Sequence, residues 1–249
     1  LSTSYPPHLI VTAPEDPKKG LSPVHQWALE HAIRVEAPER LHPELFGTEP
    51  IDLFIIVAYG KILPKNILSI PTHGVLNIHP SLLPYHRGAA PIQSAILAGD
   101  KETGVTIMVP DEKVDHGPIL AQTRIPMPEK TDGITLSKEL AELGATLLLA
   151  TLPRFISGEI KPTEQEHAKA TFTKLLKKED GKILWDQPAE IIERIIRAYL
   201  LWPTAWTTIG SLRIKIFSAH VGDKTSAAPG TPLRPLRHEF AIAAKDYVI

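Results

Sequence analysis

The sequence contains no cysteine, and this absence excludes several classes of site at once. Without thiols there is no disulfide framework, thiolate zinc site, iron–sulfur cluster or cysteine nucleophile. Long hydrophobic runs are also lacking, because the longest candidate, residues 51–59, contains Asp52 and ends at Gly60. It falls far short of the roughly 18 apolar residues of a membrane-spanning helix. We therefore expect a soluble protein with no membrane partner, and the missing thiols fit a reducing compartment.

What the chain does contain is balanced charge, ample apolar surface and much proline. In 249 residues, 27 basic and 28 acidic side chains leave a formal net charge of −1, and 43% of the residues are hydrophobic. This composition can bury a core and predicts one large or two modest globular domains. The 24 prolines, nearly twice the usual share of roughly 5%, indicate many sharp boundaries between elements.

Runs of β-branched residues alternate with helical patterns in the first part of the chain. Strands are expected near residues 9–12, 53–58, 74–78 and 104–109, and helices near 25–33, 90–98 and 136–152. This alternation is typical of βαβ units. We therefore predict an α/β fold for residues 1–155, with a Rossmann-like, mostly parallel sheet whose functional loops follow the carboxyl ends of its strands.

The periodicity fades in residues 156–173, which are expected to form a linker. After it, a helix near residues 188–197 and short broken strands predict a small C-terminal β-barrel, OB-like, in residues 174–249. Charge divides at the same place: residues 1–173 hold 15 basic and 20 acidic side chains, and residues 174–249 hold 12 and 8. The basic excess is either an ordinary solvated face or a surface for a polyanion.

The densest polar cluster lies where a predicted strand ends, in residues 77–84. Strand alternation places Asn77 and His79 on the same side, and an amide beside an imidazole is suited to hold an oxyanion and move a proton. A second polar loop, residues 111–118, follows the next predicted strand. Adjacent strands would bring Asp115 to this pair. The alternative is that these polar groups merely cap their loops.

Several motifs together resemble the folate-dependent formyltransferases. They are Asn77 to Pro84, Arg87 to Gln93 (Arg-Gly-Ala-Ala-Pro-Ile-Gln), Gly104 to Met108, Val114 to Gly117, Val57 to Gly60, Ile62 to Pro64, and the Trp-Pro-x-x-Trp stretch within residues 198–206. The Arg-Gly-Ala-Ala-Pro-Ile-Gln stretch specifically resembles the methionyl-tRNA formyltransferases. The resemblance extends over nearly the whole chain.

This resemblance implies transfer of the formyl group of 10-formyltetrahydrofolate to the α-amino group of methionyl initiator tRNA, for translation initiation. It also implies that Asn77 and a cationic His79 stabilise an oxyanion, while Asp115 keeps His79 charged and relays protons. No metal is expected, because His73 and His86 lack ligand spacing. We expect a monomer that acts in the cytoplasm, or in the mitochondrial matrix or plastid of a eukaryote.

The resemblance assigns binding residues as well. Folate contacts are expected from Lys61, Ile62, Leu63, Ser81, Leu82, Leu83, Pro84 and Asp111, and tRNA contacts from Arg87, Lys18 and Lys19. The alternatives are core packing for Ile62 and Leu63, bracing of its own loop for Arg87, and an ordinary solvated pair for the two lysines.

Two departures from the family pattern stand out. The family's first strand, glycine turn and helix have no counterpart before Leu9, and Tyr247 to Ile249 resembles a barrel strand at which the chain stops. We therefore expect either a fragment or a gap filled by another segment. The loop of residues 14–23 is shorter and less basic than in the tRNA enzymes, which predicts altered docking of tRNA.

Two other functions stay open. One keeps the folate chemistry but changes the acceptor to a sugar nucleotide amine or glycinamide ribonucleotide; the Arg-Gly-Ala-Ala-Pro-Ile-Gln motif and the basic C-terminal part disfavour it. The other is an inactive, truncated chain that binds folate or tRNA, which the missing first strand suggests.

Overall fold

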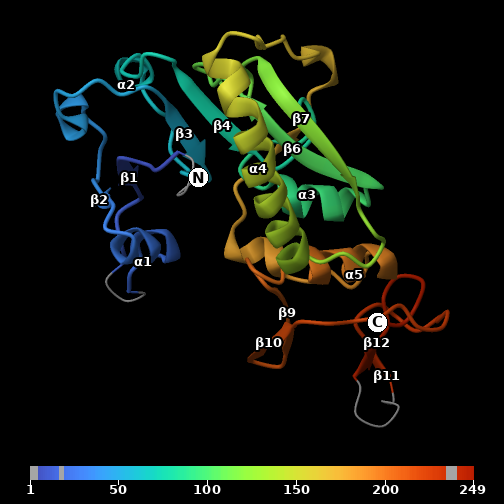
Figure 1. Cartoon of the computed structure of the whole chain (residues 1–249). Coiled ribbons are helices and arrows are strands. Elements are labelled where there is room, and N and C mark those ends of the chain that lie inside the picture. Colours follow the sequence, from blue (N-terminus) through green and yellow to red (C-terminus); the bar gives the residue numbers. More distant parts are fainter. Residues whose placement is uncertain (1–4, 17–19, 234–239) are drawn as a thin grey trace. The chain divides into compact units, whose positions relative to one another are not determined.

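A computed structural model describes residues 5–16, 20–233 and 240–249 of the chain (Figure 1). The helices are α1 (Pro23–Glu30), α2 (Lys65–Leu68), α3 (Pro91–Ala98), α4 (Gly133–Ile156) and α5 (Ala189–Ala198), with short 3-10 turns at Pro43–Phe46, His167–Lys169 and Lys178–Gly181. The strands are β1 (Leu9–Val11), β2 (Arg34–Glu36), β3 (Phe54–Val57), β4 (Val75–His79), β5 (Arg87–Gly88), β6 (Glu102–Met108), β7 (Ile119–Pro126), β8 (Phe172–Thr173), β9 (Ala205–Ile209), β10 (Leu212–Ile216), β11 (Pro232–Leu233) and β12 (Ala241–Ile242).

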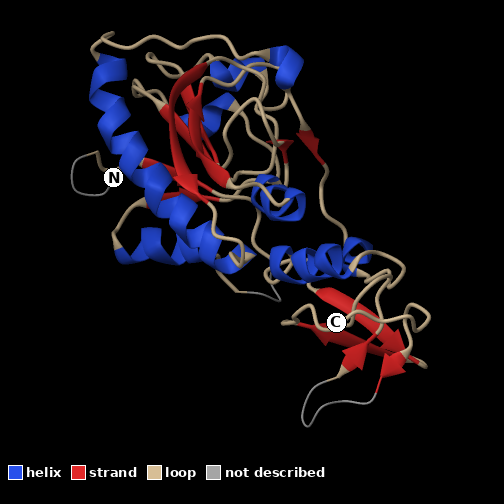
Figure 2. Cartoon of the chain, turned by 90° about the vertical axis from the view of Figure 1, so that its right-hand side faces the viewer, coloured by secondary structure: helices blue, strands red, loops and turns tan. Residues whose placement is uncertain are grey.

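The chain forms two compact units, and each is built from several stretches of sequence. The first unit comprises Leu1–His79, Thr106–Gln122 and Gly144–His167, and the second comprises Pro80–Val105, Thr123–Leu143 and Ala168–Ile249. The chain contains both helices and strands, which Figure 2 distinguishes by colour. The expected α/β class is confirmed. The domain boundaries drawn from the sequence at residues 155 and 173 stay a prediction.

The largest sheet has the strand order β3-β4-β6-β7. β3 and β4 are parallel, with Phe54 opposite Val75, whereas β6 runs antiparallel to β4. An antiparallel strand within an otherwise parallel sheet is common in α/β folds. The ladder places Met108, the last residue of β6, opposite Asn77, and Thr106 opposite His79. The two strands that carry the predicted site are therefore neighbours, as expected.

One apolar core fixes these strands in the first unit. Leu76 of β4, Ile107 of β6 and Leu120 of β7 pack with Leu148 and Leu152 of α4, and all five are buried. Leu148 and Leu152 lie four residues apart and so project from one face of the helix. Burying each such side chain contributes roughly 1.5–3 kcal/mol. The strand ends that carry the polar residues thus rest on a rigid support.

The second unit has its own core around α5. Ile192 and Ile196, one helical turn apart, pack with Ile183, Ala205 and Ala244. β9 and β10 form an antiparallel hairpin, and β11 pairs antiparallel with β12. In the described part of this unit these are separate two-stranded sheets, and the closed OB-like barrel stays a prediction.

One strand was not predicted, and the predicted linker contains paired residues. β7 was not expected, because Gln122 and Arg124 interrupt its apolar residues; in the structure they alternate with less exposed neighbours. Residues 156–173, expected to be a linker, include strand β8 and pair through Thr163 with Ile119 of β7. Among the helices of the described residues, none is long and apolar enough to cross a membrane.

Candidate active site

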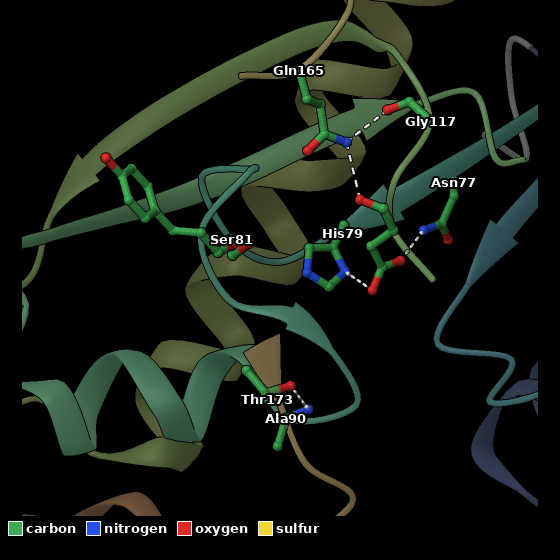
Figure 3. A network of polar contacts seen from close by, with 9 residues as sticks. Asn77, His79, Ser81, Ala90, Gly117, Gln165 and Thr173 are labelled. Carbon is green, nitrogen blue, oxygen red and sulfur yellow. Dashed lines mark hydrogen bonds and ion pairs between the residues drawn. The ribbon is translucent and has the colours of Figure 1, made fainter. Parts of the chain in front are cut away.

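Asn77 and His79 lie on the same side of β4 (Figure 3). The side chains of both lie close to the carboxylate of Asp115. The side-chain nitrogen of Asn77 lies 3.5 Å from Oδ1 of Asp115, and Nδ1 of His79 lies 3.6 Å from Oδ2. His79 is buried, with 5% of its surface exposed, and Asp115 is half-buried. The structure therefore brings together the three residues that the sequence singled out for catalysis.

Asp115 lies in a tightly folded loop, residues 111–117, which we call the Asp115 loop. Asp115 itself has a φ of +48°, in the left-handed region that non-glycine residues rarely adopt. At Gly117 a Cβ atom would lie 2.0 Å from the carbonyl oxygen of Val109, so no larger residue fits without a backbone shift. Both features mean that the direction of the carboxylate depends on how the loop is held.

Asp111 stabilises the start of this loop. Its carboxylate accepts hydrogen bonds from the backbone N–H of Lys113, at 2.8 Å, and from Nδ1 of His116, at 2.6 Å. Partial burial by itself would raise the pKa of Asp111, but these hydrogen bonds and the neighbouring charges outweigh it and lower the pKa below 3.8. Asp111 is thus ionised at neutral pH and braces its own loop.

Residues 163–167 lie along the Asp115 loop and contact it at alternate positions. Thr163 exchanges two backbone hydrogen bonds with Ile119, at 2.7 and 2.8 Å. The side-chain amide of Gln165 donates to the carbonyl oxygens of Asp115, at 3.0 Å, and Gly117, at 2.6 Å (Figure 3). The ring of His167 stacks on that of His116, with centroids 4.1 Å apart and planes at 4°. We call residues 163–167 the brace segment.

The predicted folate residues of the first unit lie in exposed loops. Lys61 is exposed and donates to the carbonyl oxygen of Glu39 at 3.0 Å. Ile62 is 74% exposed, which rules out core packing as its role, whereas Leu63 is half-buried. Asp111 is exposed as well. An isoleucine side chain open to solvent is available for contact with a ligand.

The predicted folate residues of the second unit form a self-braced loop. Ser81 is fully buried and donates its hydroxyl to the carbonyl oxygen of Tyr85 at 2.7 Å. Leu83 is buried, and Leu82 and Pro84 are half-buried. Ser81 and Leu83 therefore shape this loop from inside, and their contact with folate stays a prediction.

Of the three residues predicted to bind tRNA, the structure describes Arg87. Arg87 is only 3% exposed and its guanidinium carbon lies 5.9 Å from the ring centroid of Phe172, on strand β5 paired with β8. This burial favours the alternative that Arg87 braces its loop, and its contact with tRNA stays a prediction. Lys18 and Lys19 lie outside the described residues.

Within the described residues, no three His, Cys, Asp or Glu side chains gather in a way that could hold a metal ion. The polar cluster of Asn77, His79 and Asp115 consists of side-chain donors and a carboxylate. Such a set is able to stabilise a developing negative charge and to move a proton.

Comparison with known proteins identifies the family. The formyl transferase family model matches residues 19–152, and the model of the formyl transferase C-terminal domain matches residues 175–249. The chain belongs to the formyl transferase family. The resemblance found in the sequence motifs is therefore confirmed.

Curated relatives of this formyl transferase cover most of the chain. The methionyl-tRNA formyltransferase of Roseiflexus castenholzii is 46% identical over 248 residues, which span 95% of this chain and 79% of that protein. The methionyl-tRNA formyltransferase of Listeria innocua is 42% identical over 244 residues, with 94% and 78% covered.

Solved structures share the fold of this formyl transferase at low identity. An N-formyltransferase from Helicobacter canadensis, in complex with folinic acid and dTDP-3-aminofucose, superimposes with a TM-score of 0.71 at 16% identity over 97% of both chains. HypX from Aquifex aeolicus, in complex with tetrahydrofolic acid, gives 0.69 at 21% identity over 96% of this chain and 42% of its own. At these identities the likeness concerns the fold alone.

Sequence reasoning missed the brace segment of this formyl transferase. Gln165 makes two hydrogen bonds to the Asp115 loop, yet its neighbourhood reads as linker because it is polar and lacks an apolar period. The only signal was the presence of polar residues at alternate positions, Thr163, Gln165 and His167.

Proposed function

We propose that this formyl transferase moves the formyl group of 10-formyltetrahydrofolate to the α-amino group of methionyl initiator tRNA, for translation initiation. The observation that carries the proposal is the meeting of Asn77, His79 and Asp115 at one point. The acceptor is inferred from relatives named methionyl-tRNA formyltransferase at 42–46% identity.

Stabilisation of the formyl oxygen is the first requirement of this reaction. As the amine nitrogen attacks the formyl carbon, negative charge develops on that oxygen. The N–H groups of Asn77 and His79 are the donors in reach, and both now face Asp115 at long distances of 3.5 and 3.6 Å. Contacts of this length between catalytic groups tighten when the substrate binds. Each donor to an oxyanion is worth roughly 10²–10³-fold in rate.

Proton transfer is the second requirement. The attacking amine must lose one proton, and N10 of the folate must gain one to leave as a neutral amine. Asp115 is half-buried beside His79, and its negative charge favours the cationic imidazole that best stabilises an oxyanion. We assign the relay of the proton, through water, to the Asp115 carboxylate.

Binding of the formyl donor is assigned to exposed loops. The folate supplies an activated formyl group on nitrogen. The exposed Ile62 offers an apolar surface for a pterin ring, and we place Lys61, Leu63 and the backbone of the Asp115 loop around it. Ser81, Leu82, Leu83 and Pro84 are assigned to the wall of the folate site, and Arg87, Lys18 and Lys19 to tRNA.

We further propose that the protein acts as a monomer and that it acts in the cytoplasm; support for the second point is that the relatives named here come from bacteria. Sedimentation analysis is expected to give a single species near 27.4 kDa. A larger species that persists on dilution would contradict the monomer.

A panel of acceptors tests the proposed reaction. The purified chain is given 10-formyltetrahydrofolate with methionyl initiator tRNA, a sugar nucleotide amine or glycinamide ribonucleotide, and the formylated product is identified by mass spectrometry. We expect formylation of methionyl-tRNA alone. Formylation of only a small-molecule amine would mean that this amine, and not methionyl-tRNA, is the acceptor. No turnover with any acceptor would reject the proposed activity.

A further inference from the structure

We propose that Gln165 is a positioning residue, which holds the Asp115 loop so that the Asp115 carboxylate meets Asn77 and His79. The effect on turnover rests on the proposed function. The contacts themselves do not, because they join only groups of the protein's own first unit.

Gln165 fixes both ends of the sharpest part of the loop. Its side-chain nitrogen donates to the carbonyl oxygens of Asp115 and Gly117, the two residues that flank His116 (Figure 3). An amide nitrogen carries two protons, and the two carbonyls take one each. Only 5% of the residue is exposed, so these bonds form away from water. One buried side chain thereby sets the distance between the two carbonyls.

The Asp115 loop depends on these two hydrogen bonds, which we call the Gln165 clamp. The positive φ of Asp115 is disfavoured for a residue with a Cβ atom, and Gly117 packs against Val109 without space for a methyl group. Carbonyl groups buried without a donor are strongly disfavoured. Loss of the clamp would let Asp115 relax to an ordinary backbone conformation, which turns its side chain in another direction.

Gln165 is itself held on both sides. Thr163 is tied by two backbone hydrogen bonds to Ile119, and His167 stacks on His116. His167 begins a 3-10 turn, and its backbone N–H donates to the carbonyl oxygen of Gln165 at 2.9 Å, so Gln165 is held between a paired residue and a turn. The brace segment thus supports the loop that carries the Asp115 carboxylate. Within this segment, the side chain of Gln165 donates the hydrogen bonds to the loop.

Two substitutions of Gln165 are expected to differ in how their effect on kcat depends on pH. Gln165→Met keeps a similar volume and removes both donors at every pH. Gln165→Glu keeps the shape but, when ionised, sets a carboxylate against two carbonyl oxygens; when protonated, it can donate one hydrogen bond. Burial and the carbonyl dipoles raise the pKa of such a carboxyl. The kcat of the Gln165→Glu protein should therefore rise toward that of wild type as the pH falls.

The experiment compares these variants with Gln122→Met. Gln122, an exposed glutamine of β7 in the same unit, donates to Thr106 at 2.7 Å and is the control. We expect Gln165→Met to lower kcat for methionyl-tRNA by about 10²-fold, with KM changed by less than about twofold. The kcat of Gln165→Glu relative to wild type should be higher at about pH 6 than at about pH 8. Gln122→Met should keep wild-type kcat.

Hydrogen exchange of the free proteins gives a readout independent of turnover. Amides of residues 111–117 should exchange faster in Gln165→Met than in wild type and Gln122→Met. Unchanged exchange there would overturn the proposal, even if the wild-type chain formylates nothing. Equal losses of kcat in Gln165→Met and Gln122→Met, with equally lowered melting temperatures, would also overturn it, because they would mean general loss of packing. An inactive wild type with faster exchange in Gln165→Met would reject the proposed function and keep the clamp.

Discussion

The Asp115 carboxylate is shared by an amide and an imidazole, and this sharing is the central feature at the scale of residues. Its two oxygens face the side chains of Asn77 and His79 separately. Removing the charge would affect both partners at once, whereas removing either partner leaves the other contact in place. Because both contacts depend on the Asp115 carboxylate, substitutions at the three residues should have strongly non-additive effects on kcat.

Substitution of the carboxylate is the sharpest test at this scale. Asp115→Asn keeps the size but not the charge, so it neither favours a cationic His79 nor accepts a proton. We expect kcat to fall by about 10²-fold or more, with little change in the melting temperature because the side chain is half-buried. Steady-state kinetics checks this. Glu112→Gln, an exposed neighbour, is the control; equal kinetics of the two variants would contradict the role of Asp115.

A second prediction at this scale concerns non-additivity. If Asn77 and His79 serve the same oxyanion, Asn77→Ala and His79→Ala should each cost roughly 10²–10³-fold in kcat. The double variant should then lose less than the product of the two. A double-mutant cycle on single-turnover rates measures this. Fully multiplicative losses would mean that the two residues act on different steps.

The catalytic residues could be predicted from the sequence, but their support could not. Asn77 and His79 follow from strand alternation at the end of β4, and Asp115 follows from the neighbouring strand. The role of Gln165 depends on the pairing of Thr163 with Ile119, residues far apart in sequence. Nothing local in the sequence encodes such a contact, because the alternation of a short polar segment also fits an exposed linker.

The turn of the Asp115 loop is the first prediction at the scale of elements. Gly117→Ala adds a Cβ atom that would lie 2.0 Å from the carbonyl oxygen of Val109. The backbone must move, so we expect a loss of about 1–3 kcal/mol in the free energy of unfolding together with a fall in kcat. At Gly222 the nearest atom to an added Cβ would be 3.5 Å away. Gly222→Ala should therefore be tolerated in denaturant unfolding and in turnover, and equal losses would refute this account of the loop.

Helix α4 begins at a charged cap that gives the fold a pH dependence. Asp132 accepts hydrogen bonds from the backbone N–H groups of Ile134, at 2.8 Å, and Thr135, at 2.9 Å. Partial burial alone would raise the pKa of Asp132, but these bonds and the charge of Arg197 outweigh it and lower the pKa below 3.8. A lowered pKa means that the cap's stabilisation is complete above pH 3.8 and fades as the pH falls through the lower, folded-state value.

Asp132→Ala should accordingly lower the free energy of unfolding by about 1 kcal/mol at neutral pH. The difference from wild type should shrink below pH 3.8, where the carboxyl becomes protonated. Urea unfolding over a pH series measures it. Asp132→Asn keeps an uncharged cap and should lose less at neutral pH; a difference from Asp132→Ala that persists unchanged in acid would refute the pH dependence of the charged cap.

Most elements could be read from the sequence because their patterns are local. β6, at Glu102–Met108, and α3, at Pro91–Ala98, match the expected strand near residues 104–109 and the expected helix near 90–98 closely. β7 was missed because its Gln and Arg residues break the apolar run, and only its position at the edge of the β3-β4-β6-β7 sheet allows them to be exposed. The antiparallel direction of β6 is a property of the assembled sheet, not of a local pattern.

The uneven distribution of charge is the feature that matters at the scale of the whole molecule. Residues 174–249 hold 12 basic and 8 acidic side chains in a chain whose formal net charge is −1. In this part the guanidinium of Arg213 lies 3.9 Å from the ring centroid of Trp206, which fixes one of the cations by a cation–π contact. A cation held in place loses little freedom on contact with a phosphate.

Binding of tRNA should therefore depend on salt through these residues. We expect Arg213→Gln to weaken tRNA binding and to reduce the slope of log K against log salt by about one. Filter binding over a salt series measures the slope, and Lys138→Gln, an exposed residue of α4, is the control. A slope unchanged by Arg213→Gln would place the tRNA contacts elsewhere.

The most direct test of the central claim is single-turnover formyl transfer from 10-formyltetrahydrofolate to methionyl initiator tRNA, for the wild type and for His79→Ala beside His73→Ala. His73 is exposed and lies before β4, so its loss should not matter. We predict formylmethionyl-tRNA with wild type and His73→Ala, and a rate at least about 10²-fold lower with His79→Ala. Equal rates for the two variants would contradict the catalytic role of the cluster.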